Sequence, residues 1–269
     1  MKLSISNIAW PADKDTEMYF YLRRQGFKGL EIAPTRIFPD KPYDHLAEAK
    51  DWVANLREEF NLEVPSMQSI WYGHQEKVFG DAQGRKILID YTKKAILFAE
   101  AINCKNLVFG NPRQRDTDNV AENMPTAIDF FKEIGDYAAD HNTIVALEAN
   151  PQIYNTRFLN RTEQAVEMAY KSHSEGIKVN VDLGTIIENK EDIEYLRQIP
   201  EYINHVHISE PGLKAIEHRE ILHKELISIL KDIKYDRFIS IEMGNHNDIE
   251  ELKNAIKYMK GVCRDERKS

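Results

Sequence analysis

The sequence has little cysteine and no long apolar run. Its 269 residues include only Cys104 and Cys263, which lie far apart and form no CxxC motif. This argues against a disulfide framework, and we expect two reduced thiols in a cytoplasmic protein. No apolar segment approaches the roughly 18 residues that a membrane-spanning helix needs, so no membrane partner is expected. The opening residues, MKLSISNIAW, read as a strand rather than as a secretory leader.

Common cofactor and nucleophile motifs are also missing. The chain contains no GxxxxGK[ST] phosphate loop, no GxGxxG dinucleotide fingerprint and no GxSxG nucleophile motif. Basic residues are outnumbered by acidic ones, and the formal net charge is −8. An acidic chain is a poor match for polyanionic nucleic acid, so we expect no nucleic-acid partner.

No stretch rich in Pro, Gly and Ser divides the chain, so a single domain over residues 1–269 is expected. Strand-like and helix-like segments alternate eight times, which is typical of a parallel sheet with outer helices. The expected strands are residues 3–9, 27–32, 62–67, 106–110, 143–151, 177–184, 202–211 and 237–244. The expected helices are residues 15–25, 43–60, 87–102, 124–140, 162–172, 192–197, 217–230 and 248–260. We predict a single (β/α)8 TIM barrel, with an open doubly wound sheet as the main alternative.

Each of the last four expected strands ends in a side chain that can bind a metal. These residues are Glu148, Asp182, His207 and Glu242, separated by 34, 25 and 35 positions, about one strand and one helix each. Parallel strands bring their carboxyl ends to one edge, where such barrels hold their active sites. Three carboxylates and one imidazole suit Mn²⁺, Co²⁺ or Mg²⁺, and Zn²⁺ is also compatible. His205 competes for the imidazole position, but His207 lies nearer the strand end and is preferred, which places His205 one layer deeper.

Polar side chains near the other strand ends are candidates for substrate contacts, although each alone is more often structural. They are Asn7, Glu31, Gln68, Asn111, Asn150 and Glu210, with His218 in the following helix region as a further candidate. Arg113 and Arg115 form a compact cationic pair that would recognise a phosphate or carboxylate group. The alternative is that the two arginines pair in solvent with Asp116 and Asp118.

The motifs LEANP, VDLG, HVHISEP and IEMG, in this order and spacing, resemble the sugar phosphate isomerase/epimerase family of xylose isomerase-like TIM barrels, within the AP endonuclease 2 superfamily. The resemblance extends over essentially the whole chain. It implies that Glu148, Asp182, His207 and Glu242 bind one divalent metal ion.

The resemblance also implies a reaction. In ketose epimerases of this group, two metal-bound glutamates face the reacting carbon from opposite sides, and here these are Glu148 and Glu242. The expected function is isomerase or epimerase activity on a sugar or sugar derivative, acidic or phosphorylated if the arginines bind it, through a metal-stabilised enediolate. Two alternatives remain open: a metal-dependent dehydratase of a keto-sugar or keto-inositol, and a non-catalytic sugar-binding barrel. A homo-oligomer is also left open.

Two departures from the family pattern limit this expectation. Thr185 stands where many members have a histidine, and Leu213 stands where ketose 3-epimerases have an arginine. Activity as a simple free-ketose 3-epimerase is therefore less favoured. The endonuclease IV branch needs the histidine that Thr185 replaces and an Asp-x-His motif that residues 216–218 lack, so nuclease activity is not expected.

Overall fold

Seven parallel strands form one curved sheet in the computed structural model, which describes residues 1–265. Their order around the sheet is β2-β1-β7-β6-β5-β4-β3, and every neighbouring pair is parallel. The strands are β1 (Lys2–Ser6), β2 (Gly29–Glu31), β3 (Leu107–Phe109), β4 (Val145–Glu148), β5 (Ile177–Asp182), β6 (Ile203–Ile208) and β7 (Phe238–Ile241).

The segment expected as the third strand, residues 62–67, joins the two edges of this sheet. It makes isolated parallel bridges, which link Ile32 to Met67 and Met67 to Leu107. The segment is not a continuous strand because Pro65 has no backbone N–H to donate to a neighbouring strand. The predicted TIM barrel is therefore confirmed, with one of its eight strands reduced to an irregular extended segment.

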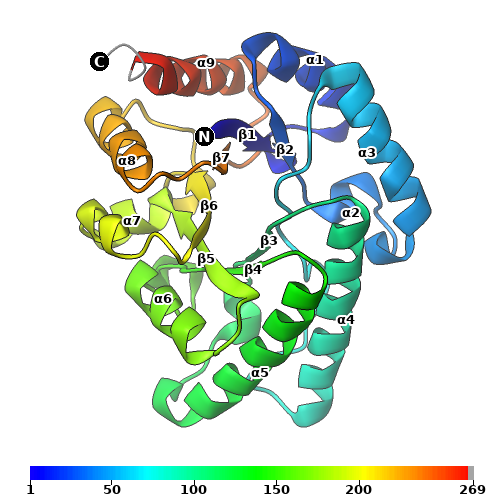
Figure 1. Cartoon of the computed structure of the whole chain (residues 1–269), viewed down its shortest axis with the longest axis vertical. Helices are drawn as coiled ribbons and strands as arrows, with labels where there is room; N and C mark the ends of the chain where they lie inside the picture. The colour runs from blue at the N-terminus through cyan, green and yellow to red at the C-terminus, as the bar shows by residue number, and fades with distance from the viewer. Residues whose placement is uncertain (266–269) are drawn as a thin grey trace.

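Helices surround the strands on the outside of the barrel (Figure 1). They are α1 (Asp15–Gln25), α2 (Pro34–Ile37), α3 (Leu46–Phe60), α4 (Ala82–Ala101), α5 (Val120–Asp140), α6 (Thr162–Lys171), α7 (Leu183–Asn189), α8 (Glu220–Asp232) and α9 (Ile249–Asp265). The helix expected over residues 192–197 is a 3₁₀ helix, Ile193–Gln198, and the short helices α2 and α7 were not expected. Across the described residues, no helix combines the length and apolarity that crossing a membrane requires.

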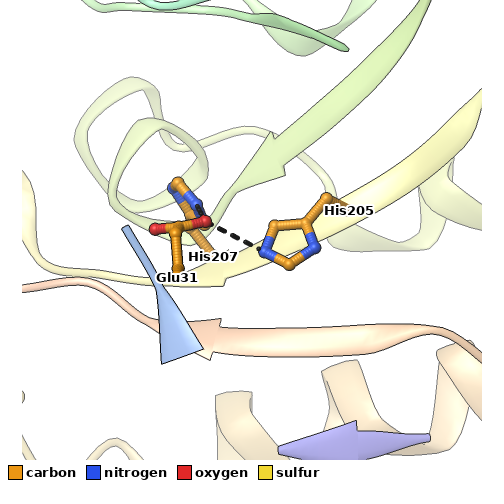
Figure 2. Close-up of side chains that lie close together, drawn as sticks. All are labelled: Glu31, His205 and His207. Carbon is orange, nitrogen blue, oxygen red and sulfur yellow. Dashed lines mark hydrogen bonds and ion pairs between the residues drawn. The ribbon is translucent and has the colours of Figure 1, made fainter. Parts of the chain in front are cut away.

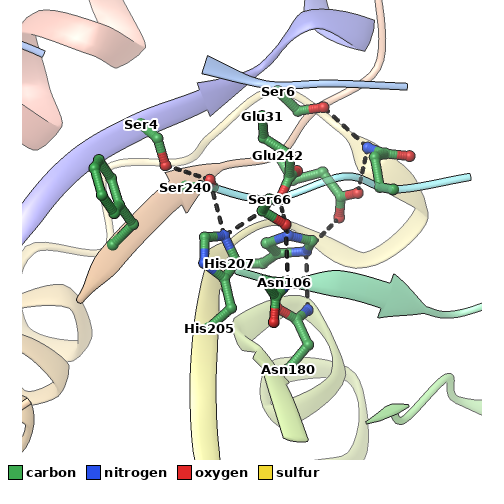
Figure 3. A network of polar contacts seen from close by, with 12 residues as sticks. Ser4, Ser6, Glu31, Ser66, Asn106, Asn180, His205, His207, Ser240 and Glu242 are labelled. Carbon is green, nitrogen blue, oxygen red and sulfur yellow. Dashed lines mark hydrogen bonds and ion pairs between the residues drawn. The ribbon is translucent and has the colours of Figure 1, made fainter. Parts of the chain in front are cut away.

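The two-residue period of the strands places polar side chains inside the barrel. In β6 the polar His205 and His207 alternate with Val206 and Ile208, and all four are buried. Successive strand side chains point to opposite faces, so the apolar set packs toward the helices while the histidines point inward. Figure 3 shows the resulting polar network in the barrel interior, in which His205 Nε2 lies 3.0 Å from Ser240 Oγ. The barrel therefore brings buried polar groups to the ends of several strands at once.

Candidate metal centre

Four potential metal ligands converge at the carboxyl ends of consecutive strands. Glu148 ends β4, Asp182 ends β5, His207 lies in β6 and Glu242 directly follows β7. One ligand atom from each residue lies within 4.8 Å of the others. The parallel register produces this convergence, since it pairs Asp182 with His207 across β5 and β6.

His207 lies at the centre of the cluster. Its Nδ1 is 3.1 Å from Glu148 Oε2 and 3.1 Å from Glu242 Oε2. Its Nε2 lies 2.9 Å from Glu31 Oε2 on the other side of the ring (Figure 2). Burial alone would lower the pKa of His207, but the carboxylates of Glu242 and Glu31 outweigh burial and raise this pKa well above its ordinary value. The ring therefore presents one nitrogen to the cluster and the other to Glu31.

Amide side chains hold the two glutamates in place. Asn180 Nδ2 donates a hydrogen bond of 2.6 Å to Glu148 Oε2, and Gln68 Nε2 donates one of 2.8 Å to Glu242 Oε1. Both amides are buried, and Figure 3 shows Asn180 beside His207. These bonds restrict the rotamers of both carboxylates, which prearranges the site.

Asp182 is oriented by the start of helix α7. Its Oδ1 accepts a 2.6 Å hydrogen bond from Thr185 N as the N-cap of that helix, and its Oδ2 accepts a 2.5 Å bond from Ser209 Oγ. The hydroxyl of Thr185 donates to Ala149 O at 2.8 Å. Thr185 thus stabilises the backbone beside Asp182 and Ala149. It occupies the position at which many members of the family that the sequence resembles have a histidine.

The donor set fits a divalent cation. Within residues 1–265, none of the carboxylates of Glu148, Asp182 and Glu242 forms an ion pair with a lysine or arginine. Burial raises the pKa of Asp182 to about 6 and that of Glu242 to about 7, and the negative charge of Glu148 adds to both shifts. Three crowded carboxylates and one imidazole nitrogen form an oxygen-rich site that a divalent ion would neutralise.

A cavity of about 900 Å³ opens above these carboxylates. Its lining includes five of the predicted substrate contacts: Gln68, Asn111, Arg113, Asn150 and Glu210. Trp71, Tyr72 and Tyr154 add aromatic surface, and Lys77 adds a second cation. Sequence reasoning assigned no role to Tyr154 or Lys77, because both lie in connecting segments without a periodic pattern.

Arg115 does not reach the cavity. It is fully buried, and its Nη2 donates 2.7 Å hydrogen bonds to Glu148 O and to Asn150 Oδ1. Arg115 therefore braces the end of β4 instead of forming a substrate-binding pair with Arg113. The alternative prediction, in which the two arginines pair with Asp116 and Asp118, is also wrong. Both aspartates form ion pairs with Arg157 instead.

Three other predicted contacts, Asn7, Glu31 and His218, also lie away from the cavity lining, and Glu31 instead contacts His207. Asn7 is fully buried, and its Oδ1 accepts a 2.9 Å hydrogen bond from Ala33 N, so it connects the residues that follow β1 and β2. His218 stacks on Tyr258, with ring centroids 4.1 Å apart. The side chains of Asn7 and His218 thus contact other parts of the protein. Their positions in the sequence did not indicate these contacts.

Comparisons with known proteins agree with this architecture. The family model described as xylose isomerase-like TIM barrel matches residues 21–262. No curated protein matches the sequence.

Three solved structures share the fold at low sequence identity. D-psicose 3-epimerase with D-tagatose from Clostridium cellulolyticum H10 has 15% identity and a TM-score of 0.79, with 98% of each chain covered. The IOLI protein with a binding zinc atom has 18% identity and a TM-score of 0.70, covering 98% of this chain and 97% of its own. The probable 3-DHS dehydratase AsbF from Bacillus anthracis has 18% identity and a TM-score of 0.70, covering 96% and 98%. Since the family model spans most of the sequence, the chain belongs to the xylose isomerase-like TIM barrel family.

Proposed function

We propose that this protein is a divalent-metal-dependent isomerase or epimerase of a sugar or sugar derivative. The observation that carries the proposal is the placement of Glu148 and Glu242. Both line the cavity, both lie 3.1 Å from His207 Nδ1, and they come from β4 and β7, with β5 and β6 between them. Two carboxylates can thus approach one substrate from two sides.

When bound, the metal ion supplies a Lewis acid that polarises a substrate carbonyl and offsets negative charge. One glutamate accepts the proton from the carbon next to the carbonyl, and the other donates a proton to the opposite face of that carbon. The carboxylate-rich donor set favours Mn²⁺, Co²⁺ or Mg²⁺, and the zinc in the IOLI structure supports Zn²⁺ as a fourth option.

A dehydratase is the second candidate. The same proton abstraction followed by loss of a β-hydroxyl group removes water, and the likeness to AsbF supports this alternative. A non-catalytic sugar-binding barrel is the third candidate, and it differs from both because it exchanges no substrate proton.

Proton exchange in D₂O separates the three candidates. The metal-loaded protein would be incubated with a panel of ketoses and keto-acids, followed by NMR and ultraviolet absorbance. We expect deuterium to enter the carbon next to the carbonyl without loss of water. Appearance of an enone absorbance would contradict the isomerase proposal and support the dehydratase. Bound metal without exchange on any substrate would contradict both enzymes and leave the binding protein.

We infer that the substrate also carries an anionic group. Arg113 and Lys77 both line the cavity and are exposed, and neither side chain has a hydrogen bond or ion pair within the described part of the chain. Their loops are joined next to these residues, because Val78 N donates a 2.8 Å hydrogen bond to Gln114 O. Two cations without protein partners on joined loops suit a phosphate or carboxylate group.

Replacing either cation should impair binding of anionic substrates only. We expect Arg113→Gln and Lys77→Gln each to raise KM for a phosphorylated or carboxylated substrate by roughly 10- to 100-fold, the value of one charge-assisted hydrogen bond, with kcat nearly unchanged. Steady-state kinetics on matched neutral and anionic substrates would measure this. Lys86→Gln, which removes an exposed lysine paired with Asp90, is the control. Equal KM changes for neutral and anionic substrates would contradict the inference.

A further inference from the structure

Glu31 is a fully buried carboxylate at the end of β2, and the mechanism above assigns it no role. Among the described residues its ion-pair partners are two imidazoles rather than a lysine or arginine. Glu31 Oε2 lies 2.9 Å from His207 Nε2 and 3.2 Å from His205 Nε2 (Figure 2). A buried carboxylate is costly unless it is paired and hydrogen-bonded, so these two imidazoles account for its presence inside the barrel.

We propose that Glu31 is a positioning residue that keeps the proton of His207 on Nε2 and so directs an unprotonated Nδ1 to the metal centre. A neutral imidazole carries one proton, and a hydrogen bond at one nitrogen decides which nitrogen is free to bind a metal. Here Nε2 lies beside Glu31, while Nδ1 lies 3.1 Å from both Glu148 and Glu242. The inference rests on the metal centre of the proposed function, but not on the reaction.

His205 contacts Glu31 from a position deeper in the barrel than His207. The two histidine rings are 5.4 Å apart and nearly perpendicular, at 89°. His205 Nε2 contacts both Glu31 Oε2 and the hydroxyl of Ser240, one layer further into the barrel (Figure 3). Glu31 Oε2 is therefore placed between two imidazoles from the same strand, which fixes the carboxylate relative to His207.

The same three residues form a second cluster whose ligand atoms lie within 4.8 Å of one another. A second metal ion held by Glu31, His205 and His207 is thus the competing explanation. We favour positioning because Glu31 and His205 are buried and neither lines the cavity, whereas Glu148, Asp182 and Glu242 all do.

Metal titration of Glu31→Gln tests the proposal. We expect the purified variant to keep its fold by circular dichroism and to bind Co²⁺ or Mn²⁺ roughly 10- to 100-fold more weakly by calorimetry, the usual effect of losing such a partner. Thr143→Ala is the matched control, because it removes a buried hydroxyl that donates to Cys104 O and contacts none of Glu31, His205 and His207. Its metal affinity should match that of the wild type.

NMR of nitrogen-labelled histidine supplies a readout that a purely structural role would not change. In metal-free wild type, at a pH where the His207 ring carries one proton, we expect that proton on Nε2 beside Glu31, and in metal-free Glu31→Gln we expect a mixture of the two tautomers. Wild-type affinity and an unchanged tautomer in Glu31→Gln would overturn the inference while leaving the metal centre intact. Two metal ions per wild-type chain would overturn it in favour of the second site. A wild type that binds no metal would overturn the metal centre itself.

Discussion

Glu148→Gln and Glu242→Gln should each slow turnover of the substrate by roughly 10²- to 10⁴-fold, the contribution of a positioned general acid or base. Glutamine matches the shape of glutamate, but its amide cannot accept the substrate proton. Deuterium exchange and product formation would be measured at a metal concentration that saturates each variant, so that weaker metal binding does not account for the loss. This is the largest effect that the geometry predicts.

The Glu148→Gln and Glu242→Gln variants should also differ in the epimer whose proton they still exchange. If each serves one face of the carbon, each variant loses interconversion yet retains slow proton exchange with one of the two epimers. Glu217→Gln is the control, because this exposed carboxylate pairs with Arg219 and does not line the cavity. Full turnover in either Glu148→Gln or Glu242→Gln would exclude a two-carboxylate mechanism.

Metal affinity should fall steeply as the pH is lowered. Burial raises the pKa of Asp182 to about 6 and that of Glu242 to about 7, so protons compete with the metal for both carboxylates in this range. Each proton that the metal displaces changes the affinity about tenfold per pH unit, so we expect a loss of roughly 10²-fold or more between about pH 8 and pH 5.5. Calorimetric titrations with Mn²⁺ at several pH values would measure this loss. An affinity that does not depend on pH would contradict the raised pKa values.

The same groups set the stability of the metal-free protein. Asp182 and Glu242 have raised pKa values, so the folded state binds more protons than the unfolded state, in which these groups titrate near about pH 4. The stability that they contribute is present at low pH and is lost as the pH rises through 6 and 7. His207, whose pKa is also raised, acts in the same direction. Metal should therefore raise Tm more at pH 8 than at pH 6, by thermal unfolding with and without a chelator.

The arrangement of the four ligands was the part of the site most accessible to sequence analysis. Glu148, Asp182, His207 and Glu242 each end or follow a run of strand-forming residues, and parallel pairing alone brings such positions to one edge. The irregular third segment could also have been anticipated, because Pro65 interrupts its ladder. These features depend on local pattern and on the direction of the strands.

Contacts across the barrel could not be predicted in the same way. Glu31 and His207 are separated by 176 positions, and their pairing depends on the register and closure of the whole sheet. Arg113 and Arg115 looked equivalent in the sequence, yet one is exposed and the other is fully buried. The backbone decides between them: Asn111 has a left-handed φ of 38°, and the following 3₁₀ turn, Pro112–Arg115, sends the two guanidinium groups in different directions.

The candidate metal ligands and one wall of the cavity come from different parts of the chain. The four candidate ligands lie between residues 148 and 242, whereas Lys77, Asn111 and Arg113, which also line the cavity, belong to the two loops before β4. Substitutions of these three residues would therefore change the cavity wall without removing a candidate metal ligand. Such a division would let this wall of the cavity vary through the first half of the chain while the candidate ligands in the second half stay unchanged.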